Sequence, residues 1–331
     1  MPTRSAALRA VLLASVLPVT LAAQSRGPAS GATAATAVTA ARAPLAPNTM
    51  GVIPVLEYHI IGDRDSRWGR HWERFARDLA LLHARGYRPI SVRQLVTKQI
   101  DIPPGTSPVV ITFDDASPGQ FRYLEENDTL RVDPRSAVGI WEAFAAKHPE
   151  WKGRGVFCVL PSADQGHALF GDKGIQGQKT AWRMQKVRFL VERGYELCNH
   201  TLWHANLGKM SDAMVQEQIA RAQLAVDSAG ARAPMRTMAL PLGIWPKNRA
   251  LLAKGSWRDP KSGRITSYEI DAVLMVAGGP AKSPFDPAFD PLRIPRVQVF
   301  GDELERLLDR LDRSGLRFVQ DSAHYLRSRA K

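Results

Sequence analysis

Cysteine is scarce in this chain, which contains only Cys158 and Cys198 among its 331 residues. This scarcity excludes a zinc-finger pattern, which needs several cysteine and histidine ligands at close spacing. Both cysteines fall in predicted strands, residues 155–160 and 195–198, which are candidates for neighbours in one sheet. An oxidising compartment would favour a disulfide between them. Two buried free thiols are the alternative and the one that we expect, although only geometry decides between them.

Acidic residues are also in deficit, with 32 Asp and Glu against 45 Lys and Arg, and the formal net charge is +13. A basic balance of this size favours anionic polymers or surfaces as neighbours, and nucleic acid is the first candidate. The chain lacks a basic-zipper or aromatic RNA-binding signature, and its arginines are scattered over helical segments such as residues 305–313. We therefore expect no nucleic-acid partner and consider an anionic cell-envelope polymer at least as good a fit.

A long apolar run is found at the N-terminus, where residues 10–22 follow Arg4 and Arg9. This run is too short and too rich in small residues for a membrane span. With the small residues at its end, the segment is typical of a secretory signal peptide over residues 1–23. We expect cleavage near Ala23 and a periplasmic or secreted protein without a transmembrane span. No cysteine follows the cleavage site to carry a lipid anchor.

Large apolar residues are nearly absent from residues 24–49, so this Ala-, Thr- and Pro-rich segment is expected to be a disordered tether. No internal repeat is visible, and residues 50–331 are long enough for one α/β domain with a large core. Predicted strands alternate with predicted helices there, which favours parallel strands joined by crossover helices. The sequence therefore predicts an α/β fold, a distorted or incomplete (β/α) barrel of about seven parallel strands.

The expected elements follow from the local patterns of apolar and turn-forming residues. Strands are expected at residues 52–60, 108–116, 155–160, 195–199, 236–241, 270–277 and 294–299, with a final one near Phe318. Helices are expected at residues 72–85, 91–98, 136–147, 180–193, 212–229 and 302–313, with a short one from Pro246. Phe75, Leu79 and Leu82 recur at helical spacing in the first helix, and Ser91 is expected to cap the second.

Two adjacent carboxylates, Asp114 and Asp115, end the apolar run that begins at Pro108. The carboxyl ends of parallel strands are where α/β proteins place their reactive groups. Neighbouring strand residues point to opposite faces, so one carboxylate can bind a metal while the other handles protons. The alternative is a turn with helix-capping carboxylates before Pro118.

His200 and His204 are four residues apart, a spacing that places both imidazoles on one face of a helical turn. They can then share one metal ion with a carboxylate from another strand, for which Asp115 is the candidate. Asp114 is then free to act as a base on the water that the metal holds, as hydrolysis of an amide or ester requires. The alternative is a pair of polar residues that satisfy backbone groups in a loop.

Three segments occur in order, each at the end of a predicted strand: Thr-Phe-Asp-Asp at 112–115, Asn-His-Thr-Leu-Trp-His at 199–204 and Ala-Leu-Pro-Leu-Gly-Ile-Trp at 239–245. Together they resemble the polysaccharide deacetylase family, also called the NodB-homology or carbohydrate esterase family four domain, over about residues 53–319. The resemblance implies a distorted barrel with a general base and a divalent metal, expected to be zinc. The implied base is Asp114, and the implied ligands are Asp115, His200 and His204.

The opening Pro-Val-Leu-Glu-Tyr-His of the domain, residues 54–59, is similar to that of exported family members in which this His is the general acid. The resemblance therefore implies that His59 protonates the leaving amine. Alternation along a strand places Glu57 on the same side as His59, where it can orient the ring or raise its pKa.

The chain departs from the family pattern at Leu242, where Tyr is usual, and it lacks the motif Arg that holds the catalytic Asp ionised. Arg296 is the candidate replacement for that Arg, and a surface Arg is the alternative interpretation. Trp203, Leu242, Gly243 and Trp245 are candidates for substrate contact, although large aromatic residues are more often part of the core.

The resemblance implies an exported, metal-dependent hydrolase that removes acetyl groups from N-acetylated amino sugars in an envelope or extracellular polysaccharide. One alternative is the same metal chemistry on O-acetyl esters or another linear amide. A second is a catalytically silent carbohydrate-binding protein, which the retention of all four metal and base residues disfavours. The sequence leaves open the glycan, the native metal and the oligomeric state.

Overall fold

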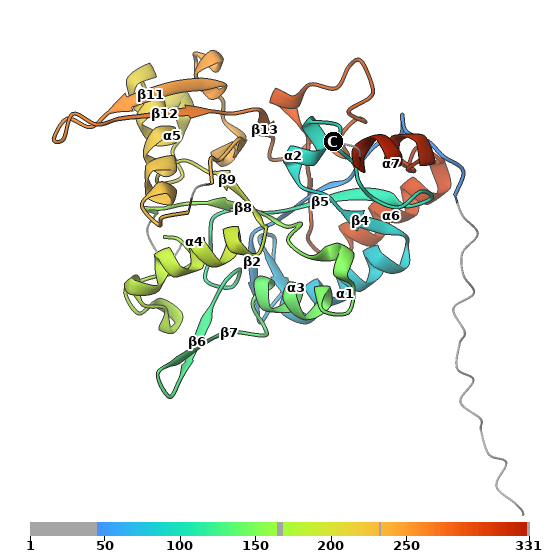
Figure 1. The fold of residues 1–331 in the computed structure, drawn as a ribbon, viewed down its shortest axis with the longest axis horizontal. Coiled ribbons are helices and arrows are strands. Elements are labelled where there is room, and N and C mark those ends of the chain that lie inside the picture. Colours follow the sequence, from blue (N-terminus) through green and yellow to red (C-terminus); the bar gives the residue numbers. More distant parts are fainter. Residues whose placement is uncertain (1–44, 164–167, 232, 330–331) are drawn as a thin grey trace, which may run out of the picture. The chain divides into compact units, whose positions relative to one another are not determined.

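The central sheet follows the strand order β13, β10, β9, β8, β5, β1 and β14, with β4 paired to β5 beside this path (Figure 1). Every pairing in this sheet is parallel, which confirms the predicted α/β architecture of about seven parallel strands in an incomplete barrel. The strands are β1 (Val55–Tyr58), β4 (Tyr87–Pro89), β5 (Ser107–Phe113), β8 (Val156–Val159), β9 (Glu196–Asn199), β10 (Thr237–Ala239), β13 (Ala272–Leu274) and β14 (Val297–Gln298).

The computed structural model describes residues 45–163, 168–231 and 233–329. The expected signal peptide and residues 24–44 of the expected tether lie outside the described residues. The last tether residues are described, and the backbone N–H of Asn48 donates to the carbonyl of Val319 at 2.9 Å. Regular hydrogen bonding therefore begins a few residues before the first expected strand.

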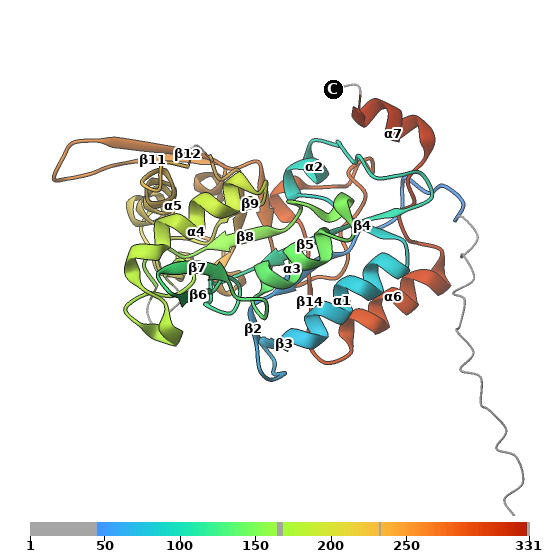
Figure 2. The same cartoon turned by 60° about the horizontal axis from the view of Figure 1, so that its bottom comes forward.

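Seven α-helices connect or flank the strands within the described ranges: α1 (Trp72–Ala84), α2 (Val92–Val96), α3 (Ala137–Ala145), α4 (Arg183–Glu192), α5 (Asp212–Asp227), α6 (Glu303–Ser314) and α7 (Ser322–Arg329). Helices α1, α3 and α6 cover one face of the sheet and share its larger apolar core (Figure 2). None of the described helices combines the length and the apolar character that a membrane crossing requires.

Strand β5 is at the centre of the sheet because its residues suit burial on both faces. All seven are buried. Val109, Ile111 and Phe113 belong to the larger core cluster, whereas Val110 belongs to the cluster on the opposite face. Because of this alternation, the side chain of Thr112 lies on the same face of the sheet as Val110, and so does that of Asp114 just beyond the strand.

Two local predictions are confirmed in the helices. Phe75, Leu79 and Leu82 form the buried stripe of α1. Ser91 caps α2 in a capping box, in which its side chain accepts from the backbone of Gln94 and the Gln94 side chain accepts from the backbone of Ser91.

Other elements differ from expectation. Two antiparallel hairpins, β6 (Tyr123–Glu126) with β7 (Thr129–Val132) and β11 (Lys254–Arg258) with β12 (Ile265–Glu269), were not predicted, and neither were β4, α7 and the short pair β2 (Ile60–Gly62) and β3 (Gly69–His71). The expected strand near Phe318 is wrong. Its place is taken by two isolated bridges of opposite sense, a parallel one of Arg317 to Val52 and an antiparallel one of Val319 to Asn48, which do not form a continuous ladder.

Cys158 and Cys198 form a disulfide, so the expectation of two free thiols is wrong. The parallel register of β8 and β9 sets these two residues directly opposite one another, with Cα atoms 4.0 Å apart. Register depends on which strands pair, and that pairing is not encoded in the local pattern of either strand.

We expect the double substitution Cys158→Ala and Cys198→Ala to lower the free energy of unfolding by about 4 kcal/mol. The reason is that the unfolded chain gains the freedom of the loop that the bond closes, which spans a sequence separation of 40 residues. Urea denaturation of the variant and of the oxidised wild type measures the difference. Equal midpoints and slopes for the two proteins would contradict the disulfide.

Candidate metal and catalytic site

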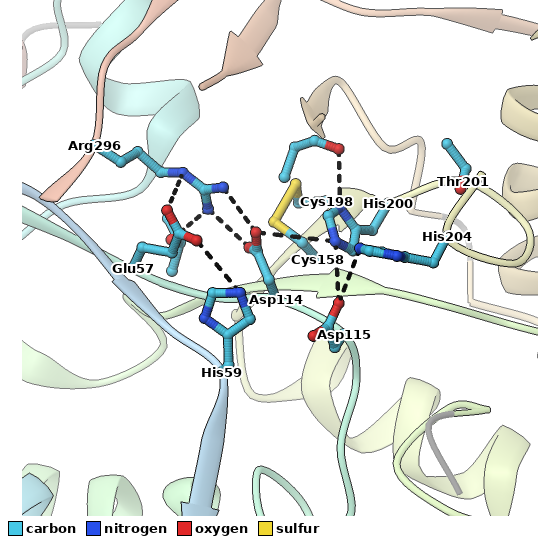
Figure 3. Close-up of polar contacts among 12 residues, drawn as sticks. Glu57, His59, Asp114, Asp115, Cys158, Cys198, His200, Thr201, His204 and Arg296 are labelled. Atoms are coloured by element: carbon cyan, nitrogen blue, oxygen red, sulfur yellow. Dashed lines mark hydrogen bonds and ion pairs between the residues drawn. A yellow bond between two sulfur atoms is a disulfide. The ribbon is translucent and has the colours of Figure 1, made fainter. Parts of the chain in front are cut away.

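The polar residues singled out in the sequence meet at the carboxyl ends of β1, β5 and β9, with β8 lying between β5 and β9 in the sheet (Figure 3). His59 follows β1, Asp114 and Asp115 follow β5, and His200 follows β9. In a parallel sheet these ends lie along one edge, so residues far apart in the sequence share one site.

Asp115, His200 and His204 converge on a single point. The Oδ1 atom of Asp115 lies 3.2 Å from Nε2 of His200 and 3.5 Å from Nε2 of His204. Two ligand atoms bonded to one tetrahedral zinc ion are about 3.4 Å apart, given bonds of about 2.1 Å. The spacing and the mixed imidazole and carboxylate donors therefore fit a divalent transition metal.

The surroundings orient these side chains toward that point. Nδ1 of His200 donates to the carbonyl of Ala239 at 2.9 Å, which leaves Nε2 to bind an ion. Asp115 and His204 both have positive φ, 75° and 62°, a costly conformation for residues with a side chain. Burial opposes ionisation of Asp115, but the hydrogen bond from His200 and nearby imidazoles outweigh it and hold the pKa of Asp115 well below its usual range.

Asp114 is held by a buried bidentate ion pair with Arg296. The two Nη atoms of Arg296 lie 2.8 and 2.7 Å from the two carboxylate oxygens, and both side chains are almost fully buried. The Arg296 guanidinium also donates to Thr112 Oγ1 at 3.0 Å and to the Met275 carbonyl at 2.6 Å. Burial alone would raise the pKa of Asp114, but the charges of Arg296 and His200 outweigh it and lower that pKa. The surface interpretation of Arg296 is therefore excluded.

Glu57 and His59 lie on the same side of the chain, as the alternation along β1 predicts. His59 Nε2 is 3.3 Å from Glu57 Oε1, and the other carboxylate oxygen is 3.4 Å from Nε of Arg296. Burial raises the pKa of Glu57 to about 8, and burial also lowers the pKa of His59. These two pKa shifts favour a protonated Glu57 beside a neutral His59 near neutral pH.

The candidate substrate residues divide between the surface and the core. Trp203 and Leu242 are 43% and 55% exposed. Gly243 follows Leu242 in the turn after Pro241, and both have positive φ. Trp245 packs against an apolar cluster and lies under the Arg249 guanidinium, so it is mainly part of the core.

A second group of His83, His148 and Glu150 also has its potential ligand atoms close together. The Arg88 guanidinium pairs with Glu150 at 3.3 Å, so a cation is already present there. The two imidazole centroids are only 4.0 Å apart, compared with 5.1 Å for His200 and His204. This second group is therefore a poorer fit to a metal ion than Asp115, His200 and His204.

Comparison with known proteins agrees with this geometry. The family model described as polysaccharide deacetylase matches residues 154–255. A chitooligosaccharide deacetylase of Sinorhizobium fredii is 35% identical over 164 residues, which cover 46% of this chain and 74% of that protein. The chain belongs to the polysaccharide deacetylase family. A second relative, the chitooligosaccharide deacetylase of a Bradyrhizobium species, is 33% identical over 112 residues. These residues cover 30% of this chain and 51% of the relative.

Solved structures of other deacetylases have the same fold as this chain. The Streptococcus pyogenes deacetylase PplD, solved in complex with acetate, has a TM-score of 0.52 and 15% identity, over 78% of this chain and 98% of PplD. A polysaccharide deacetylase from Bacillus cereus has the same TM-score and identity, over 84% of this chain and 69% of the other. The family model begins after β5, so the structure is what joins Asp114 and Asp115 to the histidines.

Two residues that lie near the site were not identified from the sequence. The Gln120 side chain donates to the backbone carbonyls of His59, at 2.6 Å, and of Asp114, and so ties two site loops together. Trp68 contacts the ring of His59. No pattern in the sequence distinguishes Gln120. Trp68 could have been noticed, because it is an isolated aromatic residue in a segment of charged and turn-forming residues.

We expect Arg296→Met to lower the free energy of unfolding by about 3–5 kcal/mol, because the Asp114 charge stays buried without its partner. Chemical denaturation at pH 7 measures the loss. Arg293→Met, at an exposed position three residues away, is the matched control and should change stability by less than about 0.5 kcal/mol. Equal effects of the two substitutions would contradict the stabilising role of the ion pair.

Proposed function

We propose that this protein is a metal-dependent deacetylase that hydrolyses the N-acetyl groups of amino sugars in a polysaccharide or its oligomers. The carrying observation is the convergence of Asp115, His200 and His204 beside an ionised Asp114 and a proton-bearing pair, Glu57 and His59. The family membership and the names of the two rhizobial relatives support the amino-sugar substrate. Zinc is the proposed ion, because two imidazoles and one carboxylate are a common zinc donor set.

Each residue has a distinct task in this proposal. A divalent ion held by Asp115, His200 and His204 would activate water and polarise the acetyl carbonyl. Asp114 accepts the proton of the attacking water, and Arg296 keeps Asp114 ionised for that purpose. On the opposite side, His59 donates a proton to the nitrogen that departs from the carbonyl carbon, and Glu57 holds the His59 ring.

We also propose that the protein is exported. The apolar residues 10–22 after Arg4 and Arg9 support this, and so does the disulfide, which persists in oxidising compartments. The mass of the mature protein in the medium or the periplasmic fraction tests it, because cleavage near Ala23 removes a defined segment. Full-length protein confined to the cytoplasm would refute export.

We expect zinc-loaded wild-type protein to release acetate from N-acetylglucosamine oligomers and to lose this activity with a chelator. Asp115→Ala should reduce kcat/KM by at least about 10³-fold at saturating zinc, since several kcal/mol of charge stabilisation are lost. Asp271→Ala, at a partly exposed carboxylate before β13, is the control and should retain activity. Acetate release from O-acetylated sugars alone would reassign the reaction to an esterase, and no release from any acetylated sugar would refute the proposal.

The Glu57 and His59 pair predicts a pH effect. In the wild type the pair retains its proton up to about pH 8, the pKa of Glu57, so the acid form should persist to that pH. In Glu57→Gln only His59 titrates, and its pKa lies below its ordinary 6.5. We expect the alkaline limb of the kcat/KM profile to shift to lower pH by about one unit or more. An unchanged alkaline limb would show that Glu57 does not supply this proton.

A further inference from the structure

We propose that Trp68 is the platform on which the sugar ring of the scissile N-acetyl group stacks. This inference rests on the proposed function, because it uses the direction in which an amide must lie in the site. It assigns the sugar side of the substrate to the loop between β2 and β3, which none of the sequence motifs includes.

The site has a direction that fixes where the sugar lies. The acetyl carbonyl must face Asp115, His200 and His204, whereas the leaving nitrogen must face His59. The sugar carbon is bonded to that nitrogen, so the ring continues outward on the His59 side. A side chain that supports the ring must therefore border His59 rather than the histidine pair.

Trp68 occupies that position. The centroids of the Trp68 and His59 rings are 4.8 Å apart, with an angle of 60° between their planes. Trp68 is 46% exposed, and the neighbouring Ile60 is 42% exposed. Within the described ranges, Trp68 and Trp203 are the two large aromatic side chains that are exposed. A partly exposed indole beside the proton donor offers apolar surface that suits the C–H face of a pyranose ring.

The platform is held in place before any ligand arrives. The carbonyl of Trp68 accepts from the N–H of Ile60 at 2.9 Å, which fixes the backbone next to His59. The neighbouring Arg67 guanidinium lies 5.2 Å from the Trp68 ring centroid and 4.3 Å from that of Phe300, and it donates to Gln298 at 2.7 Å. A side chain that is already ordered loses little conformational entropy when a ligand binds.

An exposed apolar side chain outside the site provides the contrast. Ile265 lies on β12, which pairs with β11 in a hairpin that carries none of the site residues. Ile265 is 53% exposed. Its removal also takes away exposed apolar surface, which makes Ile265→Ala a suitable control.

The experiment uses zinc-loaded wild type, Trp68→Ala, Trp68→Phe and Ile265→Ala. Two substrates are compared, an N-acetylglucosamine tetramer and the small ester 4-nitrophenyl acetate, which has no sugar ring. We expect Trp68→Ala to raise KM for the tetramer at least tenfold with kcat changed less than threefold, and to leave ester hydrolysis and its pH profile unchanged. Trp68→Phe should retain most of the affinity, and Ile265→Ala should not raise KM.

Binding without turnover gives a second measurement. The deacetylated glucosamine tetramer is titrated calorimetrically into each protein, and Trp68→Ala should weaken its affinity at least tenfold. A tetramer KM and product affinity equal to those of wild type would overturn the platform while the deacetylase remains. A pH profile for the ester that shifts in Trp68→Ala, with unchanged tetramer KM, would instead show that Trp68 only shields His59. If wild type neither binds nor deacetylates any amino-sugar oligomer, the proposed function fails and the platform fails with it.

Discussion

The site depends on the buried pairing of Arg296 with Asp114. Arg296 precedes β14, and its guanidinium reaches the end of β5. Strand β1 lies between these two strands, and the guanidinium also contacts Glu57 on β1. Two opposite charges without much access to water are stable only when they are paired and hydrogen-bonded, as Arg296 and Asp114 are. The pairing keeps Asp114 anionic and fixes it beside His200, whose Nε2 is 4.0 Å from the Asp114 carboxylate.

The two halves of the site have opposite electrostatic requirements. Around Asp115, His200 and His204 the chain presents a carboxylate and two imidazole Nε2 atoms at one point, the donor types that a divalent cation requires. Around Glu57 and His59 burial keeps a proton on the pair. Arg296 lies between these environments: it pairs with both carboxylate oxygens of Asp114, and its Nε is 3.4 Å from Glu57.

Much of this arrangement could be predicted from the sequence, because it depends on local patterns. Asp114, Asp115 and His200 follow apolar runs that form strands, and a parallel sheet gathers such strand ends. The partner of Asp114 was suggested only by the resemblance to a family, since nothing local distinguishes Arg296 from other arginines in a basic chain. The disulfide and the position of Trp68 depend on register and on the path of the β2 and β3 loop. Those features arise from tertiary pairing, which the amino-acid pattern of a single segment does not specify.

The pairing of Asn48 with Val319, next to that of Val52 with Arg317, brings the first described segment beside the one that leads into α7, the last described helix. A polypeptide that enters and leaves at neighbouring points can be joined into a loop of another protein without stretching either connection. The same closeness allows the original ends to be linked and new ones to be opened elsewhere on the surface. The fold is therefore suited to circular permutation and to insertion as a module in a larger chain.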